Sequence, residues 1–554
     1  MEIPVYIWYN KNDSNKGCLL MKQRIISFLL CFGLLFAFTA CNDDTAGSII
    51  YYPVYQTMKS CDPQVAVSDV EKIIVYNCFE GLVRMNADGE IRPAAASNWT
   101  VSDDGKTYTF SLRRDAKWNV SSYAVEALQE RLPENFSPGV TADDFVFALQ
   151  RAVDPNTGAP EAPLLYSIEN ARNIHNGLLD VSVLGVEAVD DYTLVIRLSE
   201  PQSNFLQVLT ECICMPCNRT FFEACAGRYG LLVRRSMYNG PFRLYQFTDT
   251  IYTLLASDVY TGQHKPRPTR VYLYYNANGE KIPEKMSDGI YSGAYLTDSM
   301  YAKTTVQSDS TVTEINNTTV CLLFNMQNEK TQNSDFRRAI CLATDARQMA
   351  AFAEKEYCGS LLPSVCNFVP AVEPEYNEEK ALQSLWSGLE NTEADSVSLT
   401  VLVSEEYTDL LKRQLQNWQK TLGLGCAVRV ESVSEAQLKN RVLKGEYEIA
   451  FYPLTASAPD TLRFLEQFTP GSTNNALHLE NAAYTGLLNA AKTASDTATQ
   501  RKYLSSAVKY LTDNYCIIPV FSESAYLLQT EGVQGIFCDA SPERIFFENA
   551  YTVQ

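Results

Sequence analysis

The chain has 554 residues, of which 46% are apolar and 20% are charged, and its formal net charge is −19. This length exceeds what one hydrophobic core supports and predicts two or three lobes, while the composition is that of a folded protein rather than a disordered one. The negative charge argues against nucleic acid as a partner, because binding to phosphates needs a basic surface.

The segment between Met21 and Cys41 indicates the cellular compartment. A short basic start precedes an apolar run over residues 25–38, which is too short to span a membrane but suits the core of a signal peptide. Small residues then lead to Cys41 in a pattern that resembles the lipobox of bacterial lipoproteins, whose cysteine is lipidated and becomes the N-terminus. We predict a lipoprotein signal peptide over residues 21–41, preceded by a misannotated upstream segment over residues 1–20. The alternative is an ordinary signal peptide with a cysteine at its boundary.

The first half of the body mixes strands and helices. Alternating and helical spacings of apolar residues predict strands over 49–55, 108–112 and 192–198 and a helix over 68–79. Thr141, followed by two aspartates, is typical of a capped helix start. That helix is expected to end at Asp154, because Pro155 follows it.

The second half shows regular alternation of strands and helices. Strands are predicted over 398–403, 426–430 and 447–452, with a helix between each pair. Gly423 is expected to close the first of these helices. The alternation predicts a parallel or mixed sheet covered by helices.

Few groups suited to catalysis are present. The chain has three histidines and no HExxH pair, Walker A loop or G-x-S-x-G motif. One cluster stands out among the sixteen cysteines, namely Cys212, Cys214, Cys217 and Cys225. Its spacing differs from the paired knuckles of structural zinc sites, and three interpretations stay open: a metal or redox site, a local disulfide, or thiols without chemistry. No cofactor is predicted.

Six motifs occur in a fixed order along the chain. They are SCDP at 60–63, FEGLV at 79–83, WTVSDDGKTYTF at 99–110, TADDFV at 141–146, NGPF at 239–242 and IPV at 518–520. Together they resemble the oligopeptide- and dipeptide-binding family, family 5, of extracellular solute-binding proteins. The resemblance covers nearly the whole chain after Cys41.

The resemblance implies an α/β fold of the periplasmic-binding-protein type, with two jaws and a hinge. It implies three subdomains: a discontinuous lobe I over 42–80, 185–300 and 515–554, an inserted lobe II over 81–184, and a lobe III over 301–514. It also implies a monomer without catalytic residues, lipid-anchored on the extracytoplasmic face of a bacterial membrane, which delivers its ligand to an ABC permease.

The resemblance also locates a ligand site. Peptide-binding members carry an aspartate for the ligand's α-amino group, after a tryptophan, and an ungapped comparison puts Ser457 and Leu454 at these two positions. Asp460 is a candidate replacement for the missing charge, although it could instead be a surface helix cap. The predicted site residues are Val67, Ser68, Leu454, Thr455, Ser457 and Asp460.

Peptide is the predicted ligand. Because the amine-binding acid is missing, the same fold binding an oligosaccharide or a metal chelate is the alternative. An extracellular hydrolase that uses carboxylates is a remote alternative, since acidic residues are plentiful. An insertion between Trp118 and Thr141 is a further departure from the family pattern.

Overall fold

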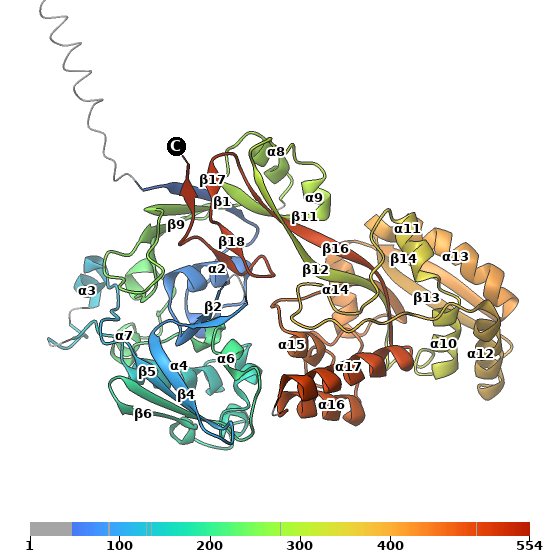
Figure 1. Ribbon diagram of the computed structural model, residues 1–554, viewed down its shortest axis with the longest axis horizontal. Coiled ribbons are helices and arrows are strands. Elements are labelled where there is room, and N and C mark those ends of the chain that lie inside the picture. Colours follow the sequence, from blue (N-terminus) through green and yellow to red (C-terminus); the bar gives the residue numbers. More distant parts are fainter. Residues whose placement is uncertain are drawn as a thin grey trace, which may run out of the picture. The chain divides into compact units, whose positions relative to one another are not determined.

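The computed structural model describes residues 47–86, 89–128, 130–134, 136–276, 279–494 and 496–553. The predicted signal segment and Cys41 lie outside the described residues. The pattern of contacts divides the chain into two units, Met1–Gly47 and Ser48–Gln554. The second unit is described below (Figure 1).

Two four-stranded sheets form the first part of this unit. The first has the order β1-β10-β9-β8, with β1 parallel to β10 and the others antiparallel. Its strands are β1 (Ile49–Val54), β8 (Phe242–Phe247), β9 (Ile251–Ala256) and β10 (Arg270–Tyr275). The second sheet, in the order β4-β5-β7-β6, is inserted between β1 and β8 and consists of β4 (Ala96–Val101), β5 (Thr107–Leu112), β7 (Thr193–Arg197) and β6 (Val186–Asp190). The inserted sheet therefore extends past residue 184 to Arg197.

Helices surround these sheets, and the two longest, α2 (Asp69–Cys78) and α4 (Ala142–Val153), pack in the apolar core. The predicted helix starts are confirmed at α2, where Ser68 and Glu71 form a capping box, and at α4, where Asp144 Oδ2 accepts the N–H of Thr141 at 2.9 Å. The other elements are β2 (Val83–Met85), β3 (Ile91–Pro93), α3 (Ser122–Leu128), α5 (Ala171–His175), α6 (Phe205–Val208) and α7 (Arg219–Ala224).

Two of the six sequence motifs contact each other beside α2. In the NGPF motif, Asn239 accepts the N–H of Glu80 at 3.0 Å and donates to its carbonyl at 2.8 Å. Glu80 belongs to the FEGLV motif. The next residue, Gly240, lies so close to Cys78 that a Cβ atom would come within 2.6 Å of the Cys78 carbonyl carbon. Only glycine fits at this point, which explains the motif sterically.

A six-stranded mixed sheet forms the second part, in the order β11-β16-β12-β15-β13-β14. β13 is parallel to both β14 and β15, and the other pairs are antiparallel, so the predicted mixed sheet is confirmed. Its strands are β11 (Gly293–Thr297), β12 (Thr311–Phe324), β13 (Val397–Ser404), β14 (Cys426–Val433), β15 (Ile449–Thr455) and β16 (Ile517–Gln529).

Helices cover both faces of this sheet. Alternate residues of β12 face opposite layers, with Val320 and Leu322 in one apolar cluster and Cys321 and Leu323 in another. The first layer has α10 (Ser334–Leu342), α11 (Ala346–Phe352), α12 (Glu378–Asn391) and α13 (Thr408–Leu422), and the second has α14 (Glu435–Lys444), α15 (Thr461–Glu466), α16 (Ala482–Lys492) and α17 (Thr497–Asp513). Gly423 ends α13 at φ 61°, as predicted.

We call residues 48–276 with 530–553 the N-lobe and residues 318–522 the C-lobe. The stretch 530–553 belongs to the N-lobe because Val533, Ile545 and Phe547 lie in the same apolar cluster as Ile50. Between the lobes lie β11 and two short helices, α8 (Ile282–Ser287) and α9 (Asp298–Tyr301). Among the described residues, no helix combines the length and the apolar character that crossing a bilayer requires.

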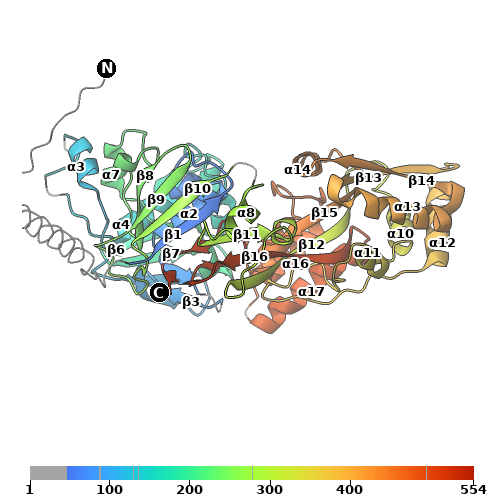
Figure 2. The same ribbon diagram turned by 90° about the horizontal axis from the view of Figure 1, so that it is seen from above.

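Two long neighbouring strands, β12 and β16, run from one lobe into the other (Figures 1 and 2). Their pairing is interrupted between Ile315 and Thr318, which marks a bulge where the strands bend. We call residues 315–318 and 523–525 the crossing segment. The lobes are thus joined by a narrow pair of strands with an irregularity in the middle.

Candidate ligand-binding site

The end of β15 forms the C-lobe side of the predicted site. Side chains alternate here as in a strand, so that Leu454 is only 2% exposed and packs in the C-lobe core, whereas Thr455 and Ser457 are exposed. A ligand can therefore reach Thr455 and Ser457. The structure does not present Leu454 beside them, because its side chain points to the opposite face.

Asp460 caps a helix and is buried, not on the surface. Its Oδ1 accepts the N–H groups of Leu462 and Arg463 at the start of α15, at 2.9 and 3.3 Å. Its Oδ2 accepts a hydrogen bond from Asn204 Nδ2 of the N-lobe at 2.7 Å. Asp460 is therefore a helix cap, which is one of the two interpretations of the sequence, but it is buried and not on the surface. To receive a ligand amine, the carboxylate would have to give up bonds that it already makes.

The start of α2 forms the N-lobe side. The buried carboxylate of Glu71 accepts four backbone N–H groups, from Lys59 (2.7 Å), Ser60 (3.1 Å), Val67 (2.9 Å) and Ser68 (3.0 Å). This fixes the loop before the helix. It also means that the N–H groups of Val67 and Ser68 are already used, so Val67 offers a ligand its side chain, which is 57% exposed.

Asp69, the first residue of α2, is an ionisable group that the sequence analysis missed. Burial raises the pKa of its carboxyl, and the positive charges of Lys72 and Lys439 only partly offset this effect. Lys439 belongs to α14 of the C-lobe, so Asp69 lies within electrostatic range of the other lobe. An acid at the first position of a helix is ordinarily explained by the helix dipole, which is why the sequence gave no reason to single it out.

A chain of hydrogen bonds connects the N-lobe with the end of β15 through the crossing segment. Tyr55 OH donates to the carbonyl of Tyr295 at 2.5 Å, and Tyr295 OH accepts a bond from Asn317 Nδ2 at 2.8 Å. The next residue, Thr318, shares a hydrogen bond with Thr455 through their hydroxyls at 2.9 Å. These side chains form a polar floor that leads from Tyr55 of the N-lobe to Thr455 at the end of β15.

A buried ion cluster also joins the lobes. Arg463 of α15 forms an ion pair with Glu211 of the N-lobe, and Arg544 Nη1 lies 3.3 Å from the same carboxylate and 3.0 Å from Tyr76 OH. Burial opposes ionisation of Glu211, but Arg463, Arg544 and Lys72 outweigh it and hold the pKa of Glu211 below its usual range. We call Tyr76, Glu211, Arg463 and Arg544 the Glu211 cluster.

Two further contacts join the lobes near this cluster. The N–H of Ser203 donates to the carbonyl of Lys492 at 2.9 Å, and Gln500 Nε2 donates to the hydroxyl of Ser203 at 2.7 Å. Together with the bond between Asn204 and Asp460, they hold residues 203–211 of the N-lobe against α15, α16 and α17.

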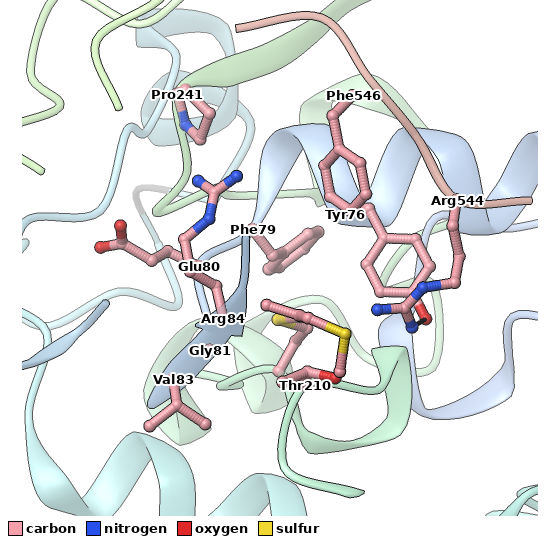
Figure 3. Close-up of a pocket in the computed structure, with 12 residues that line it drawn as sticks. Tyr76, Phe79, Glu80, Gly81, Val83, Arg84, Thr210, Pro241, Arg544 and Phe546 are labelled. Carbon is pink, nitrogen blue, oxygen red and sulfur yellow. Dashed lines mark hydrogen bonds between the residues drawn. The ribbon is translucent and has the colours of Figure 1, made fainter. Parts of the chain in front are cut away.

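A small pocket lies beside the Glu211 cluster (Figure 3). Tyr76, Phe79, Arg84 and Arg544 are among its lining residues, and Figure 3 shows the ring of Phe79 between the side chains of Arg84 and Tyr76. Its volume of about 40 Å³ has room for a few water molecules. The pocket is therefore too small for a peptide.

The four clustered cysteines lie in the N-lobe interior as free thiols. Burial raises the pKa of Cys217 to about 12 and that of Cys225 to about 11. Such thiols stay protonated at neutral pH and make poor nucleophiles and metal ligands. The geometry fits the interpretation of these residues as packing groups, and the disulfide interpretation does not hold in this structure.

A carboxyl in the crossing segment titrates near neutral pH. Glu523 of β16 lies opposite Thr318, and Tyr407 donates a hydrogen bond to it. Burial and then the charge of Glu406 raise the pKa of Glu523 from an ordinary 4.5 to about 7, although Lys355 works in the other direction. Lys355 itself pairs with Asp298 of α9.

This shift predicts the pH dependence of stability. Because the folded protein binds the Glu523 proton more tightly than the unfolded chain, the stabilising contribution is complete below about pH 4.5 and is lost as pH rises to about 7. We expect Glu523→Gln to remove a pH-dependent loss on the order of 3 kcal/mol from denaturant unfolding curves between pH 4.5 and 8. Glu531→Gln, at an exposed position just beyond β16, should leave the pH slope unchanged. Identical slopes for the Glu523 variant and the parent would contradict the prediction.

Comparisons with known proteins agree with this architecture. The family model for bacterial extracellular solute-binding proteins, family 5, matches residues 90–476. The dipeptide-binding protein DppE of Bacillus subtilis is 26% identical over 539 residues, which cover 92% of this chain and 95% of that protein. The probable deoxycholate-binding periplasmic protein YgiS of Escherichia coli is 25% identical, over 88% of this chain and 91% of YgiS. The solved structure of the murein tripeptide binding protein MppA of Escherichia coli superposes with a TM-score of 0.72 at 23% identity, over 92% of this chain and 99% of that one.

Proposed function

Because this chain belongs to family 5 of the bacterial extracellular solute-binding proteins, we propose that it captures peptides between its N-lobe and its C-lobe and delivers them to an ABC importer. We further propose that Cys41 carries a lipid that anchors the protein to the extracytoplasmic face of the membrane. Capture needs closure of the two lobes around the ligand, and the narrow crossing segment is where such a motion would bend the chain.

The polar floor is the observation that carries this proposal. It links Tyr55 of the N-lobe through the crossing segment to Thr455, next to the exposed Ser457, although these residues are far apart in the sequence. An extended peptide presents backbone donors and acceptors along its length, and the hydroxyl and amide groups along this floor are suitable partners for them. Asp69 supplies a carboxylate for a ligand's amine, in place of the acid missing at Ser457.

A non-peptide solute, such as an oligosaccharide or a metal chelate, is the second candidate. Ser457 is exposed and uncharged at the predicted amine position, while Asp460 is occupied by its own helix and by Asn204. The relative YgiS, which matches 88% of this chain, is named as a probable deoxycholate-binding protein. Deoxycholate is not a peptide.

A thermal-shift screen of the body from Ser48 onward tests the proposal. We expect peptides with a free N-terminus to raise Tm by several degrees, since a ligand at 100 times its Kd adds about 2.7 kcal/mol. Peptides acetylated at the N-terminus should be weaker. Oligosaccharides, bile salts and metal chelates form the comparison set, and a shift from one of these with none from peptides would replace the peptide proposal by the second candidate.

A pair of variants at Ser457 sharpens the test. Ser457→Asp adds a carboxylate at the predicted amine position and should strengthen binding of free-amine peptides about tenfold, because a charge-assisted hydrogen bond contributes about 1.5–3 kcal/mol. Ser457→Asn has nearly the same size without the charge and should give no such gain. Equal affinities for both variants would mean that the ligand's amine does not lie at residue 457.

A further inference from the structure

A group of charged side chains lies where β16 leaves the C-lobe. It consists of Asp298, Lys355, Glu406 and Glu523, which lie within electrostatic range of one another, and we call it the hinge cluster. Lys355 forms an ion pair with Asp298, and Tyr407 donates a hydrogen bond to Glu523. The cluster thus has three carboxyl groups around one ammonium group.

Lys355 is held by the C-lobe. Tyr357, two residues on, pairs with Phe521 of β16, and the N–H of Ser522 donates to the carbonyl of Glu356 at 3.1 Å. Phe521 packs in an apolar cluster of the C-lobe. The backbone that carries Lys355 therefore moves with the C-lobe.

Asp298 is held from the other side of the crossing segment. It follows directly after β11, whose last residue pairs with Ala525 of β16. Within β11, the N–H of Tyr295 donates to the hydroxyl of Tyr52 in β1 at 3.0 Å, which bonds this strand to the N-lobe. In Figure 1, α9 lies toward the N-lobe end of β16 and α11 toward its C-lobe end. The ion pair between Asp298 and Lys355 therefore spans the bulge where the strands bend.

Glu523 competes with this ion pair from within the crossing segment. When it is ionised, Glu523 attracts Lys355 and repels Asp298 and Glu406. When it is protonated, it does neither, and Lys355 is left to Asp298. The charge of Glu523 thus determines how strongly the ion pair ties the two sides of the bend together.

Other charged groups around the hinge cluster are exposed. Lys303 and Glu435 influence the ionisation of Glu406, and Glu314 of β12 accepts a hydrogen bond from Ser524, the neighbour of Glu523. Water and salt screen exposed charges more strongly than partly buried ones. The exposed charged groups on the surrounding elements are Lys303, Glu314, Glu354, Glu356, Glu405 and Glu435.

The structure also shows which arrangement of the lobes contains the ion pair. Asp298 and Lys355 are paired in the same structure in which Arg463 of the C-lobe contacts Glu211 of the N-lobe. The pair therefore belongs to the arrangement in which the lobes touch. Since the pKa of Glu523 is about 7, a proton on Glu523 favours this arrangement below neutral pH, and the preference is lost as pH rises through about 7.

We propose that the hinge cluster is a pH-sensitive strut, which holds the lobes together in acidic surroundings and lets them separate when Glu523 gives up its proton to the solvent. Lys355 then turns from Asp298 to Glu523, and the two sides of the bend are free to move apart. The inference rests on the proposed function, because it adds control by pH to ligand capture between the lobes. Ligand is held more tightly in acidic than in alkaline surroundings.

Hydrogen exchange of the full-length protein without ligand tests the strut directly. The N–H of Ser203 donates across the lobes to the carbonyl of Lys492, so its protection reports whether the lobes touch. After correction for the intrinsic pH dependence of exchange, we expect this protection to fall about tenfold from pH 6 to pH 8. Amides inside β13 serve as the reference and should not change.

Variants of the hinge cluster give opposite results if the strut exists. Glu523→Gln keeps the neutral form at every pH, so its Ser203 protection at pH 8 should equal that of the parent at pH 6. Asp298→Asn removes one end of the ion pair and should lower the protection at both pH values. Asp309→Asn, at an exposed position ahead of β12, should behave like the parent. Protection that does not depend on pH, or that changes equally in the parent and in Glu523→Gln, overturns the proposal.

Binding of short alanine peptides separates the strut from the proposed function. Their Kd should rise about tenfold more from pH 6 to pH 8 in the parent than in Glu523→Gln, and this comparison cancels the titration of the peptide's own amine. A pH-dependent Ser203 protection without peptide binding would support the strut and contradict only peptide capture. A Kd that depends on Glu523 while the protection stays constant would mean that Glu523 acts on the ligand, which overturns the strut.

Discussion

Replacement of Asp62 by alanine is expected to lower the free energy of unfolding by about 3–5 kcal/mol. Asp62 belongs to the SCDP motif and makes a two-pronged ion pair with Arg151 of α4, with distances of 2.6 and 3.2 Å. Both side chains are buried. After the substitution the guanidinium keeps Gln64 Oε1 at 2.6 Å and the ring of Phe222, but its charge loses its counter-ion.

Denaturant unfolding measures this effect, and two comparisons isolate its cause. Asp62→Leu/Arg151→Met removes both charges and should cost less than Asp62→Ala, because no buried charge is left unpaired. Asp409→Ala breaks an exposed pair with Lys412 and should change stability by less than about 0.5 kcal/mol. A loss as small for Asp62→Ala as for Asp409→Ala would mean that water replaces the missing carboxylate.

Replacement of Arg463 by methionine is expected to weaken ligand binding by about tenfold, if the lobes close on the ligand as proposed. Arg463 is the C-lobe member of the Glu211 cluster, so its ion pair exists only while the lobes are in contact. Glu211 keeps Arg544 and Tyr76 when Arg463 is removed. No buried charge is left unpaired. The expected loss of binding free energy is therefore only the coupling between this contact and lobe closure, usually about 1–3 kcal/mol.

Calorimetric titration with a ligand from the thermal-shift screen measures the change in Kd. Glu211→Gln should weaken binding in the same direction, and the double variant should be little worse than either single one, because the two residues act as a pair. Lys492→Met, which breaks a partly exposed ion pair with Glu466 inside the C-lobe, is the matched control. If Arg463→Met binds ligand like the parent, the cluster does not contribute to the bound state.

Local features of the sequence predicted the local structure. The capping pattern at Ser68 and Glu71, the glycine at 423 and the alternation of apolar residues each depend on neighbours a few positions away, and each predicted element is present. The ordered motifs predicted the family, which the match over residues 90–476 supports.

The site was less predictable, because its geometry depends on distant partners. Asp460 was predicted either as an amine-binding acid or as a surface cap, and its hydrogen bond with Asn204 of the other lobe joins residues that are 256 positions apart. Glu211 and Arg463 are separated by 252 positions, and no local pattern marks either one.

The route of residues 530–553 has a consequence for how the protein matures. The N-lobe core contains Ile50 and Phe547 together, and Ser48 Oγ accepts the N–H of Thr552 at 2.8 Å. The N-lobe therefore cannot be completed by its first 230 or so residues during synthesis, since contacts of such long sequence separation form late. A chain whose packing waits for residues so far along its length closes its N-lobe core only after nearly all of it has been synthesised, so a truncation that removes residues 530–553 would leave the core of the first lobe open.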